Sequence, residues 1–131
     1  MDVMGSIEKL IGAEIQEPEA LVAEAEERIR EYFEAENAEK WELCSPTYRS
    51  KYTRENFIIA CGDWFPLVRS YRIINVSLPS GILATVTVEI EMEGHKIERR
   101  ISLMKEKAAY QPDPDAPYFV VGNTAPPYCL A

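Results

Sequence analysis

The chain has 131 residues, of which 47% are hydrophobic and 27% charged, a composition typical of one globular domain with a hydrophobic core. Because 14 Lys and Arg residues stand against 22 Asp and Glu residues, the net charge of −8 disfavours a nucleic-acid partner, whose phosphates require clustered cations. No apolar run reaches the roughly 18 residues of a membrane helix, and the first five residues, MDVMG, lack the pattern of a secretory signal. We therefore expect a cytoplasmic protein with no membrane partner.

The cysteines favour the same location. Cys44, Cys61 and Cys129 form an odd set without C-x-x-C spacing, and each stands among apolar neighbours. This pattern favours buried, reduced thiols over a disulfide or a metal site. Since the chain has a single histidine, His95, and scattered thiols, we expect no metal cluster, and we assign no cofactor.

Residues 1–17 precede the first strong helix signal. Apolar residues stand there at helical spacing, but two glycines weaken the segment and no capping residue opens it. We predict an N-terminal arm or short helix over 1–17, either partly ordered or packed on the domain or on a second subunit.

The main helix is predicted to begin at Pro18, because proline is favoured at the first helical position. Its apolar stripe consists of Val22, Ala25, Ile29, Tyr32 and Phe33. Continuing this stripe leads to Glu36 and Lys40, so either the helix breaks or a charge points inward. Asn37 suits a helix end, and a break there places Trp41 on the core side, so we predict the break.

Two short helices are predicted to follow. Ser45 before Pro46 and, further on, Thr53 have the side-chain oxygens of N-cap residues. The aromatic residues of this segment are Tyr48, Tyr52, Phe57, Trp64 and Phe65. Because this is more aromatic area than short helices need for their own stability, we expect them to close over a core or a cavity.

Beyond Pro66 the hydrophobic period changes from helical to two, which predicts strands. The first strand, 69–78, has Arg72, Ile74, Val76 and Leu78 on one predicted face and Tyr71 and Ile73 on the other. After a Pro-Ser-Gly turn, residues 82–92 alternate as a half-buried strand, and Glu93-Gly94 forms the turn of a hairpin. Apolar residues on both faces of the first strand predict a homodimer formed through the sheet.

The hairpin turn sets the register of the next strand. The predicted pairs are Met92 with His95, Glu91 with Lys96, Ile90 with Ile97, Val88 with Arg99, Val86 with Ile101 and Ala84 with Leu103. Arg99 thereby shares a face with apolar residues, so it must reach the rim of the sheet, form an internal ion pair or meet a ligand. Beside the turn, His95 is predicted to be exposed rather than to act as a base.

The C-terminal part is predicted to contain one more strand. Three prolines within 111–117 remove donors for a ladder, so the segment from Lys105 to Pro117 is predicted to form a loop without strand. Residues 118–121 are predicted as the last strand, and 122–131 as an extended tail on the surface. The domain is therefore placed at 18–121.

One long helix, two short helices and a run of antiparallel strands predict an α+β fold in which a curved antiparallel sheet wraps a helix. The residues that carry a family likeness are Glu36-Asn37, Trp41-x-Leu43, Ser45-Pro46-x-Tyr48-Arg49 and Thr53-x-Glu55-Asn56-Phe57. Over 18–121 this pattern resembles the nuclear transport factor 2-like (cystatin-like cone) superfamily, particularly its small bacterial members. The chain departs from the superfamily where a proline-rich loop and Tyr118-Phe119 replace a short turn and a tryptophan-bearing strand.

The resemblance implies two classes of function, because the superfamily contains both enzymes and binding or assembly domains. Its ketosteroid isomerase-like, polyketide cyclase-like and epoxide hydrolase-like enzymes use a carboxylate or histidine in the cone with tyrosine donors. In this chain Glu89 and Glu91 are predicted to point outward. The Arg-x-Asp motif of the epoxide hydrolase-like members is absent, because Arg100 and Ile101 follow Arg99. Asp63 is equally well explained as a surface residue at a helix end. We predict a non-catalytic small-molecule-binding or dimerisation domain, with an acid/base enzyme of the ketosteroid isomerase-like or polyketide cyclase-like type as the alternative.

The predicted pocket is an aromatic-lined cone with one cation. Its residues are Tyr32, Trp41, Phe57, Trp64, Tyr71 and Arg99. A mostly apolar cavity with one fixed polar group is typical of small-molecule sites. Because a desolvated arginine needs an opposite charge, we expect a small apolar or anionic ligand, such as an acidic aromatic or a fatty acid-like anion. No catalytic residue and no metal ligand is assigned.

Overall fold

The computed structural model describes residues 18–122 and 124–128. The helices are α2 (Pro18–Glu34), α3 (Asn37–Leu43), α4 (Pro46–Lys51), α5 (Arg54–Trp64) and the 3-10 helix η1 (Phe65–Leu67). The strands are β1 (Val68–Ser80), β2 (Leu83–Met92), β3 (His95–Met104), β4 (Glu106–Ala108), β5 (Gln111–Pro112) and β6 (Val120–Val121). The arm predicted at 1–17 lies outside the described residues. Within them, no helix is both long enough and apolar enough to cross a membrane.

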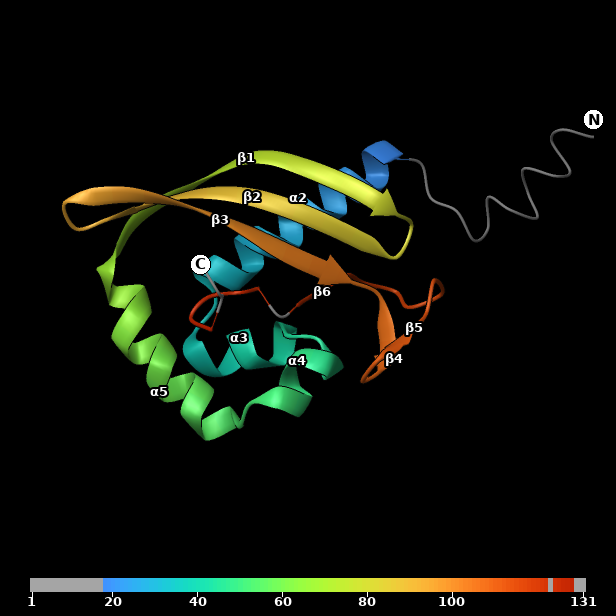
Figure 1. The fold of residues 1–131 in the computed structure, drawn as a ribbon, viewed down its shortest axis with the longest axis horizontal. Coiled ribbons are helices and arrows are strands. Elements are labelled where there is room, and N and C mark those ends of the chain that lie inside the picture. Colours follow the sequence, from blue (N-terminus) through green and yellow to red (C-terminus); the bar gives the residue numbers. More distant parts are fainter. Residues whose placement is uncertain (1–17, 123, 129–131) are drawn as a thin grey trace, which may run out of the picture.

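A curved antiparallel sheet and a set of helices form the two sides of the fold (Figure 1). The sheet has the strand order β1-β2-β3-β6, and α2 packs against β1, β2 and β6 on its concave side. The short helices lie on the same side, where α3 packs on both α2 and α5. The predicted α+β class is confirmed, and the arrangement is consistent with a nuclear transport factor 2-like fold.

The boundaries of the short helices follow their capping residues. Ser45 Oγ accepts a hydrogen bond from Tyr48 N at 2.9 Å, and Thr53 Oγ1 accepts one from Asn56 N at 3.2 Å. Both predicted N-caps are therefore confirmed. The predicted break between the first two helices is confirmed as well, since α2 ends and α3 begins on either side of two non-helical residues.

The register of the β2–β3 hairpin is the predicted one. All six predicted pairs are present: Met92 with His95, Glu91 with Lys96, Ile90 with Ile97, Val88 with Arg99, Val86 with Ile101 and Ala84 with Leu103. At the turn Gly94 has a φ of 85°, a conformation that glycine adopts without a steric penalty. Every second side chain of β2 is buried, and this alternation, together with the turn, fixes the register of the hairpin.

The predicted faces of β1 are wrong beyond Ile73, because the strand contains a β-bulge. Ile73 pairs with Val88, whereas Asn75 pairs with the next residue of β2, Thr87, so Ile74 is an extra residue in the ladder. An extra residue shifts the following side chains to the other face of the sheet. The residues of β1 that pack on the core are Val68, Tyr71, Ile73, Val76 and Leu78.

The segment predicted as a loop without strand contains a short ribbon. In it β4 and β5 pair, with Glu106 opposite Pro112 and Ala108 opposite Gln111. The prediction is wrong here because a proline is tolerated in a two-stranded ribbon, where one side of each strand has no neighbour. The last strand of the main sheet is also shorter than predicted, since β6 begins at Val120.

The tail predicted on the surface, 122–131, packs into the interior over its described residues, 122 and 124–128. Ala125 and Pro126 are fully buried, and Tyr128 is partly buried against the core. The prediction followed the prolines, which exclude helix and central strand. It missed that these apolar residues gain more by packing inside than by lying on the surface.

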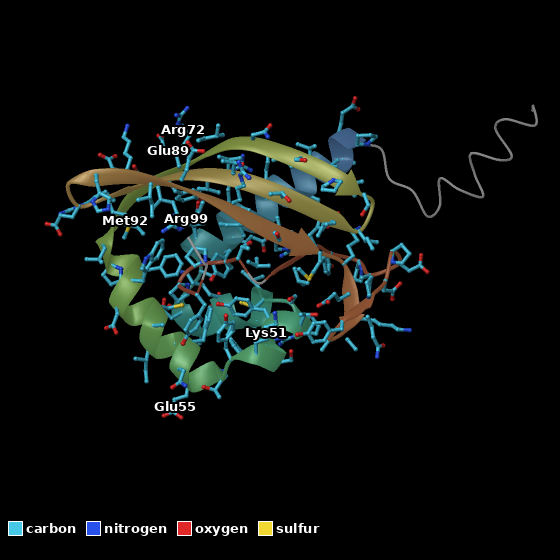
Figure 2. The ribbon with its side chains drawn as sticks, in the orientation of Figure 1. Lys51, Glu55, Arg72, Glu89, Met92 and Arg99 are labelled. Carbon is cyan, nitrogen blue, oxygen red and sulfur yellow. The ribbon has the colours of Figure 1, made fainter. Side chains whose placement is uncertain are left out.

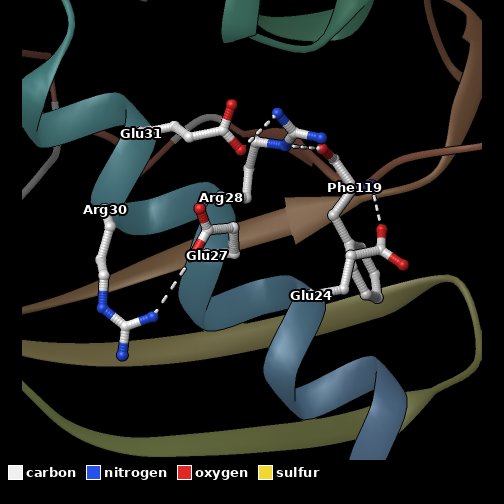
Figure 3. A network of polar contacts seen from close by, with 6 residues as sticks. All are labelled: Glu24, Glu27, Arg28, Arg30, Glu31 and Phe119. Atoms are coloured by element: carbon white, nitrogen blue, oxygen red, sulfur yellow. Dashed lines mark hydrogen bonds and ion pairs between the residues drawn. The ribbon is translucent and has the colours of Figure 1, made fainter.

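Polar side chains of α2 hold the residue that leads into β6 (Figure 3). Glu24 Oε2 accepts a hydrogen bond from Phe119 N at 2.8 Å, and Arg28 Nε donates one to Phe119 O at 2.9 Å. Lys105 Nζ lies 3.8 Å from Glu24 Oε1 and 5.2 Å from the centroid of the Phe119 ring. Because these side chains occupy both backbone groups of Phe119, α2 fixes the end of the sheet without a neighbouring strand.

Candidate functional site

Of the six residues predicted to line a pocket, the five aromatic ones belong to two separate clusters, and the sixth is the cation Arg99. Those buried in the core are Tyr32, Trp41 and Phe57. Those half-buried are Trp64, Tyr71 and Arg99. Within the described part of the chain, the cation–π contacts involve other cations than Arg99.

The first cluster joins α3, α4, α5 and the C-terminal segment. The Trp41 and Phe57 ring centroids are 5.3 Å apart, and Tyr48 lies 5.8 Å from Phe57 and 4.9 Å from Tyr52. Tyr128 stacks on Tyr52 at 4.2 Å with an interplanar angle of 6°. The Tyr48 hydroxyl is buried and has no hydrogen-bond partner among the described residues. Burial raises its pKa, so it stays protonated and is a free donor.

The second cluster joins the end of α2 to η1 and β1. Phe33 stacks on Tyr71 at 4.5 Å and 19°. Phe65 lies edge-on to Tyr32 at 6.0 Å and to Phe33 at 5.8 Å, and its ring centroid is 4.8 Å from that of Trp64. A surface pocket of about 370 Å³ beside this cluster is lined by Phe33, Phe65, Val68, Arg69, Ser70 and Tyr71.

An acidic pocket adjoins the second cluster. Its volume is about 420 Å³, and its lining residues are Glu31, Glu34, Ala35, Glu39, Glu42 and Leu43. The Tyr71 hydroxyl donates to Glu34 Oε2 at 2.6 Å. Burial and then this hydrogen bond raise the pKa of Tyr71 to about 12. Four carboxylates make this pocket unsuitable for the anionic ligand predicted from the sequence.

Arg99 points from β3 toward the helices. In Figure 2 it lies on the opposite side of the sheet from Arg72 and Glu89. Its Nη1 donates to Glu98 O at 3.2 Å, while its Nε is buried and has no hydrogen-bond partner among the described residues. The predicted alternative of an internal ion pair for Arg99 is not found, since none of the salt bridges between described residues includes it.

Lys40 is a second cation in the interior. It is 3% exposed, and its Nζ donates to Ala35 O and, at 3.4 Å, to Phe33 O, and lies 4.4 Å from the Phe65 ring centroid. Burial lowers its pKa. The predicted helix break is present, whereas an inward Glu36 is not, since Glu36 is exposed; the charged side chain that points inward is Lys40. The ammonium is tolerated inside because it pairs with carbonyls at the end of α2.

Two free thiols lie in the core. Cys44 and Cys61 are buried and free, as predicted, and Cys129 lies outside the described residues. The Cys44 thiol donates to Lys40 O at 3.2 Å. Burial raises the pKa of both thiols, that of Cys61 to about 12. Because the thiolate is the reactive form, neither is suited to nucleophilic catalysis at neutral pH.

The acid and base candidates named from the sequence lie outside the interior. Glu89 is on the outer face of the sheet, 3.3 Å from Arg72 and 3.9 Å from Lys96. Asp63 and His95 are exposed. Over 18–122 and 124–128, no group of three or more His, Cys, Asp or Glu residues could hold a metal ion.

Comparisons of this chain with models of known protein families, with curated proteins and with solved structures found no match in any of the three.

Proposed function

We propose that this protein is a non-catalytic domain of the nuclear transport factor 2-like superfamily that binds a small anionic aromatic or fatty acid-like ligand. The Arg99 guanidinium is the observation that carries the proposal. It lies on the helix-facing side of β3, next to Ile97 and Ile101 on the same face, with a buried and unpaired Nε in the described part of the chain. A ligand carboxylate there would satisfy this donor through charge-assisted hydrogen bonds, which planar guanidinium groups form well.

The aromatic residues of the interior support an apolar partner for the rest of the ligand. Trp41 and Phe57 pack on each other in the core, and Tyr32 lies on α2, which packs on the concave side of the sheet. Rings of this kind supply apolar area with few rotatable bonds, which lowers the entropic cost of binding.

The ketosteroid isomerase-like or polyketide cyclase-like alternative is less well supported. Such chemistry needs a carboxylate or histidine beside the substrate with a tuned pKa. Glu89, Asp63 and His95 are the candidates from the sequence, and all three face away from the interior or are exposed. A buried tyrosine donor, Tyr48, is the one part of that machinery present in the first cluster.

We also propose that the protein is a cytoplasmic homodimer. The cytoplasm is supported by the free thiols of Cys44 and Cys61, since reducing compartments preserve them. The dimer is supported by the outer sheet face, where Ile74 is 44% exposed among charged residues that a second copy can pair with. The β-bulge at Ile74 moves Val76 and Leu78 from that face to the core side, so the interface would be more polar than the sequence predicted. A mass of 14.9 kDa by light scattering at micromolar concentration would contradict a dimer.

The ligand proposal is tested by replacing Arg99 with leucine. Wild type is screened by thermal shift against benzoate, naphthoates and medium-chain fatty acids. A ligand at 100 times its Kd adds about 2.7 kcal/mol of stability, which corresponds to several degrees in Tm. Since hydrogen bonds to charged groups contribute about 1.5–3 kcal/mol, Arg99→Leu should weaken binding roughly tenfold to a hundredfold.

The matched control is Arg100→Leu. Arg100 is the next residue of β3, is exposed, and pairs with Thr87 on the outer face. This variant should keep the full thermal shift. If Arg99→Leu keeps it too, the carboxylate is not bound at Arg99 and the proposal is wrong.

A further inference from the structure

The described end of the chain runs along β3 after β6. Gly122 N donates to Ser102 O at 2.6 Å, and Ser102 N donates to Thr124 Oγ1 at 2.7 Å. A Cβ on Gly122 would lie 2.8 Å from Ser102 O and would also overlap with Met104 Cε. Only glycine lets the chain approach β3 this closely.

From there residues 124–128, which we call the strap, enter the interior. The chain turns with Ala125 N donating to Gly122 O at 3.1 Å. Ala125 and Pro126 are fully buried, and the Pro126 carbonyl accepts a hydrogen bond from the Tyr32 hydroxyl. In Figure 1 the strap lies between the sheet and the short helices.

The ring of Tyr128 completes the first aromatic cluster. It stacks on Tyr52, and its centroid lies 6.4 Å from that of Tyr48 and 6.3 Å from that of Phe57. Near this ring the Tyr48 hydroxyl is buried without a partner among the described residues. The strap therefore contributes two groups to the interior. These are the Tyr128 ring, which packs among other aromatic rings, and the Pro126 carbonyl, which accepts a hydrogen bond from the Tyr32 hydroxyl.

Among the described residues, few backbone hydrogen bonds hold the strap. Pro126 and Pro127 have no N–H, so two of its five residues cannot donate to a ladder. The bonds described above are the turn at Ala125, the side chain of Thr124 and the carbonyl of Pro126. A segment held by side-chain packing and few backbone bonds opens more readily than the strands of the sheet.

We propose that the strap is a built-in occupant of an aromatic binding site, and that a flat, uncharged aromatic molecule with a carbonyl group binds there by displacing it. Such a molecule reproduces both strap contacts: its ring replaces Tyr128 against Tyr52, and its carbonyl replaces that of Pro126 as the acceptor for Tyr32. Tyr48 gives it an additional donor. The closed strap weakens binding, because the apparent affinity is the intrinsic affinity multiplied by the fraction of molecules in which the strap is open.

The site is tested with 4-hydroxyacetophenone as the probe. Removing the competing ring in Tyr128→Ala should tighten binding of the probe at least tenfold relative to wild type, measured by titration in NMR spectra. Tyr118→Ala removes a tyrosine that is 60% exposed and outside the strap, so it should bind like wild type. Equal affinity in all three proteins would overturn the proposal.

A measurement on wild type covers the case in which Tyr128→Ala does not fold. Hydrogen exchange is followed with and without saturating probe at the Ala125 amide and at Val86 and Val88 in β2. The probe should accelerate exchange at Ala125 at least threefold and leave β2 unchanged. Unchanged or slower exchange at Ala125 would overturn the proposal.

The two proposed sites share Tyr32 and Phe57 but are tested separately. Because the probe has no charge, Arg99→Leu should bind it as wild type does. Loss of benzoate binding in Arg99→Leu reports on the anion site, whereas tighter binding of the probe in Tyr128→Ala reports on the strap, so either proposal can fail alone.

Discussion

Replacing Lys40 with methionine tests whether a buried ammonium stabilises the junction of α2 and α3. Methionine keeps an unbranched apolar side chain of similar length and removes the charge and the donors. The Ala35 and Phe33 carbonyls then lose the donor that the ammonium provides. The Phe65 ring loses a cation 4.4 Å from its centroid.

The expected magnitude follows from these contacts. Hydrogen bonds to charged groups contribute about 1.5–3 kcal/mol, and a buried carbonyl without a donor costs about 1–3 kcal/mol. A desolvated cation–π contact adds about 0.5–2 kcal/mol. The variant also avoids the desolvation cost of burying an ammonium, which partly offsets these losses. The lowered pKa of Lys40 shows that wild type carries this cost. We expect Lys40→Met to lower the free energy of unfolding by about 1–3 kcal/mol.

Urea unfolding at pH 7 measures this difference, with an unchanged m-value showing that both proteins unfold alike. Lys51→Met is the matched control, because Lys51 is exposed at the end of α4, 6.0 Å from the Tyr110 ring centroid. An exposed substitution of this kind should change the free energy of unfolding by no more than about 0.5 kcal/mol.

The pH dependence gives a second readout. Folding lowers the pKa of Lys40 below its usual value of 10.5, so between the two pKa values the unfolded chain binds more protons at this site than the folded one. Stability of wild type relative to Lys40→Met should therefore rise as the pH rises through this window toward 10.5, and be constant below it. If Lys40→Met is as stable as wild type at pH 7 or more stable, the desolvation of the ammonium outweighs its contacts and the reasoning is wrong.

Two further substitutions test the contacts that hold the C-terminal half. Glu24→Ala removes the acceptor of the Phe119 N–H and should lower the free energy of unfolding, measured in urea, by about 2–4 kcal/mol. Glu27→Ala, a control at an exposed position of α2, should lower it by less than about 1 kcal/mol. Equal losses in the two variants would show that the bond between Glu24 and Phe119 adds no stability. Gly122→Ala places a methyl group 2.8 Å from Ser102 O and should cost about 1–3 kcal/mol, so an unchanged thermal midpoint would contradict the close approach.

The sequence by itself determined the features that depend on neighbours along the chain. The helix starts at Ser45 and Thr53 need only a side-chain oxygen and an N–H three residues later. The β2–β3 register needs only a two-residue turn at Gly94 and the alternation of side chains on either side of it. Such interactions are fixed before the rest of the chain is placed, so a pattern of residue types is sufficient to predict them.

The candidate site was predicted less completely for the opposite reason. The sequence placed Arg99 correctly on the inner face, because its position follows from the hairpin register. It assigned the aromatic residues to one pocket, whereas in the structure they form two clusters. Which rings meet depends on how α2, α5 and β1 cross in space, and no spacing along the chain encodes these angles.

Only the tertiary structure decided the bulge, the buried lysine and the strap. The bulge at Ile74 is a property of how β1 pairs with β2, and Lys40 is tolerated inside because the end of α2 and the Phe65 ring surround its ammonium. The strap depends on a contact between Tyr32 and Pro126, 94 residues apart in the chain. The sequence alone shows that the prolines prevent regular secondary structure in this segment. Whether the segment lies on the surface or in the core depends on the apolar surface that the folded domain offers it.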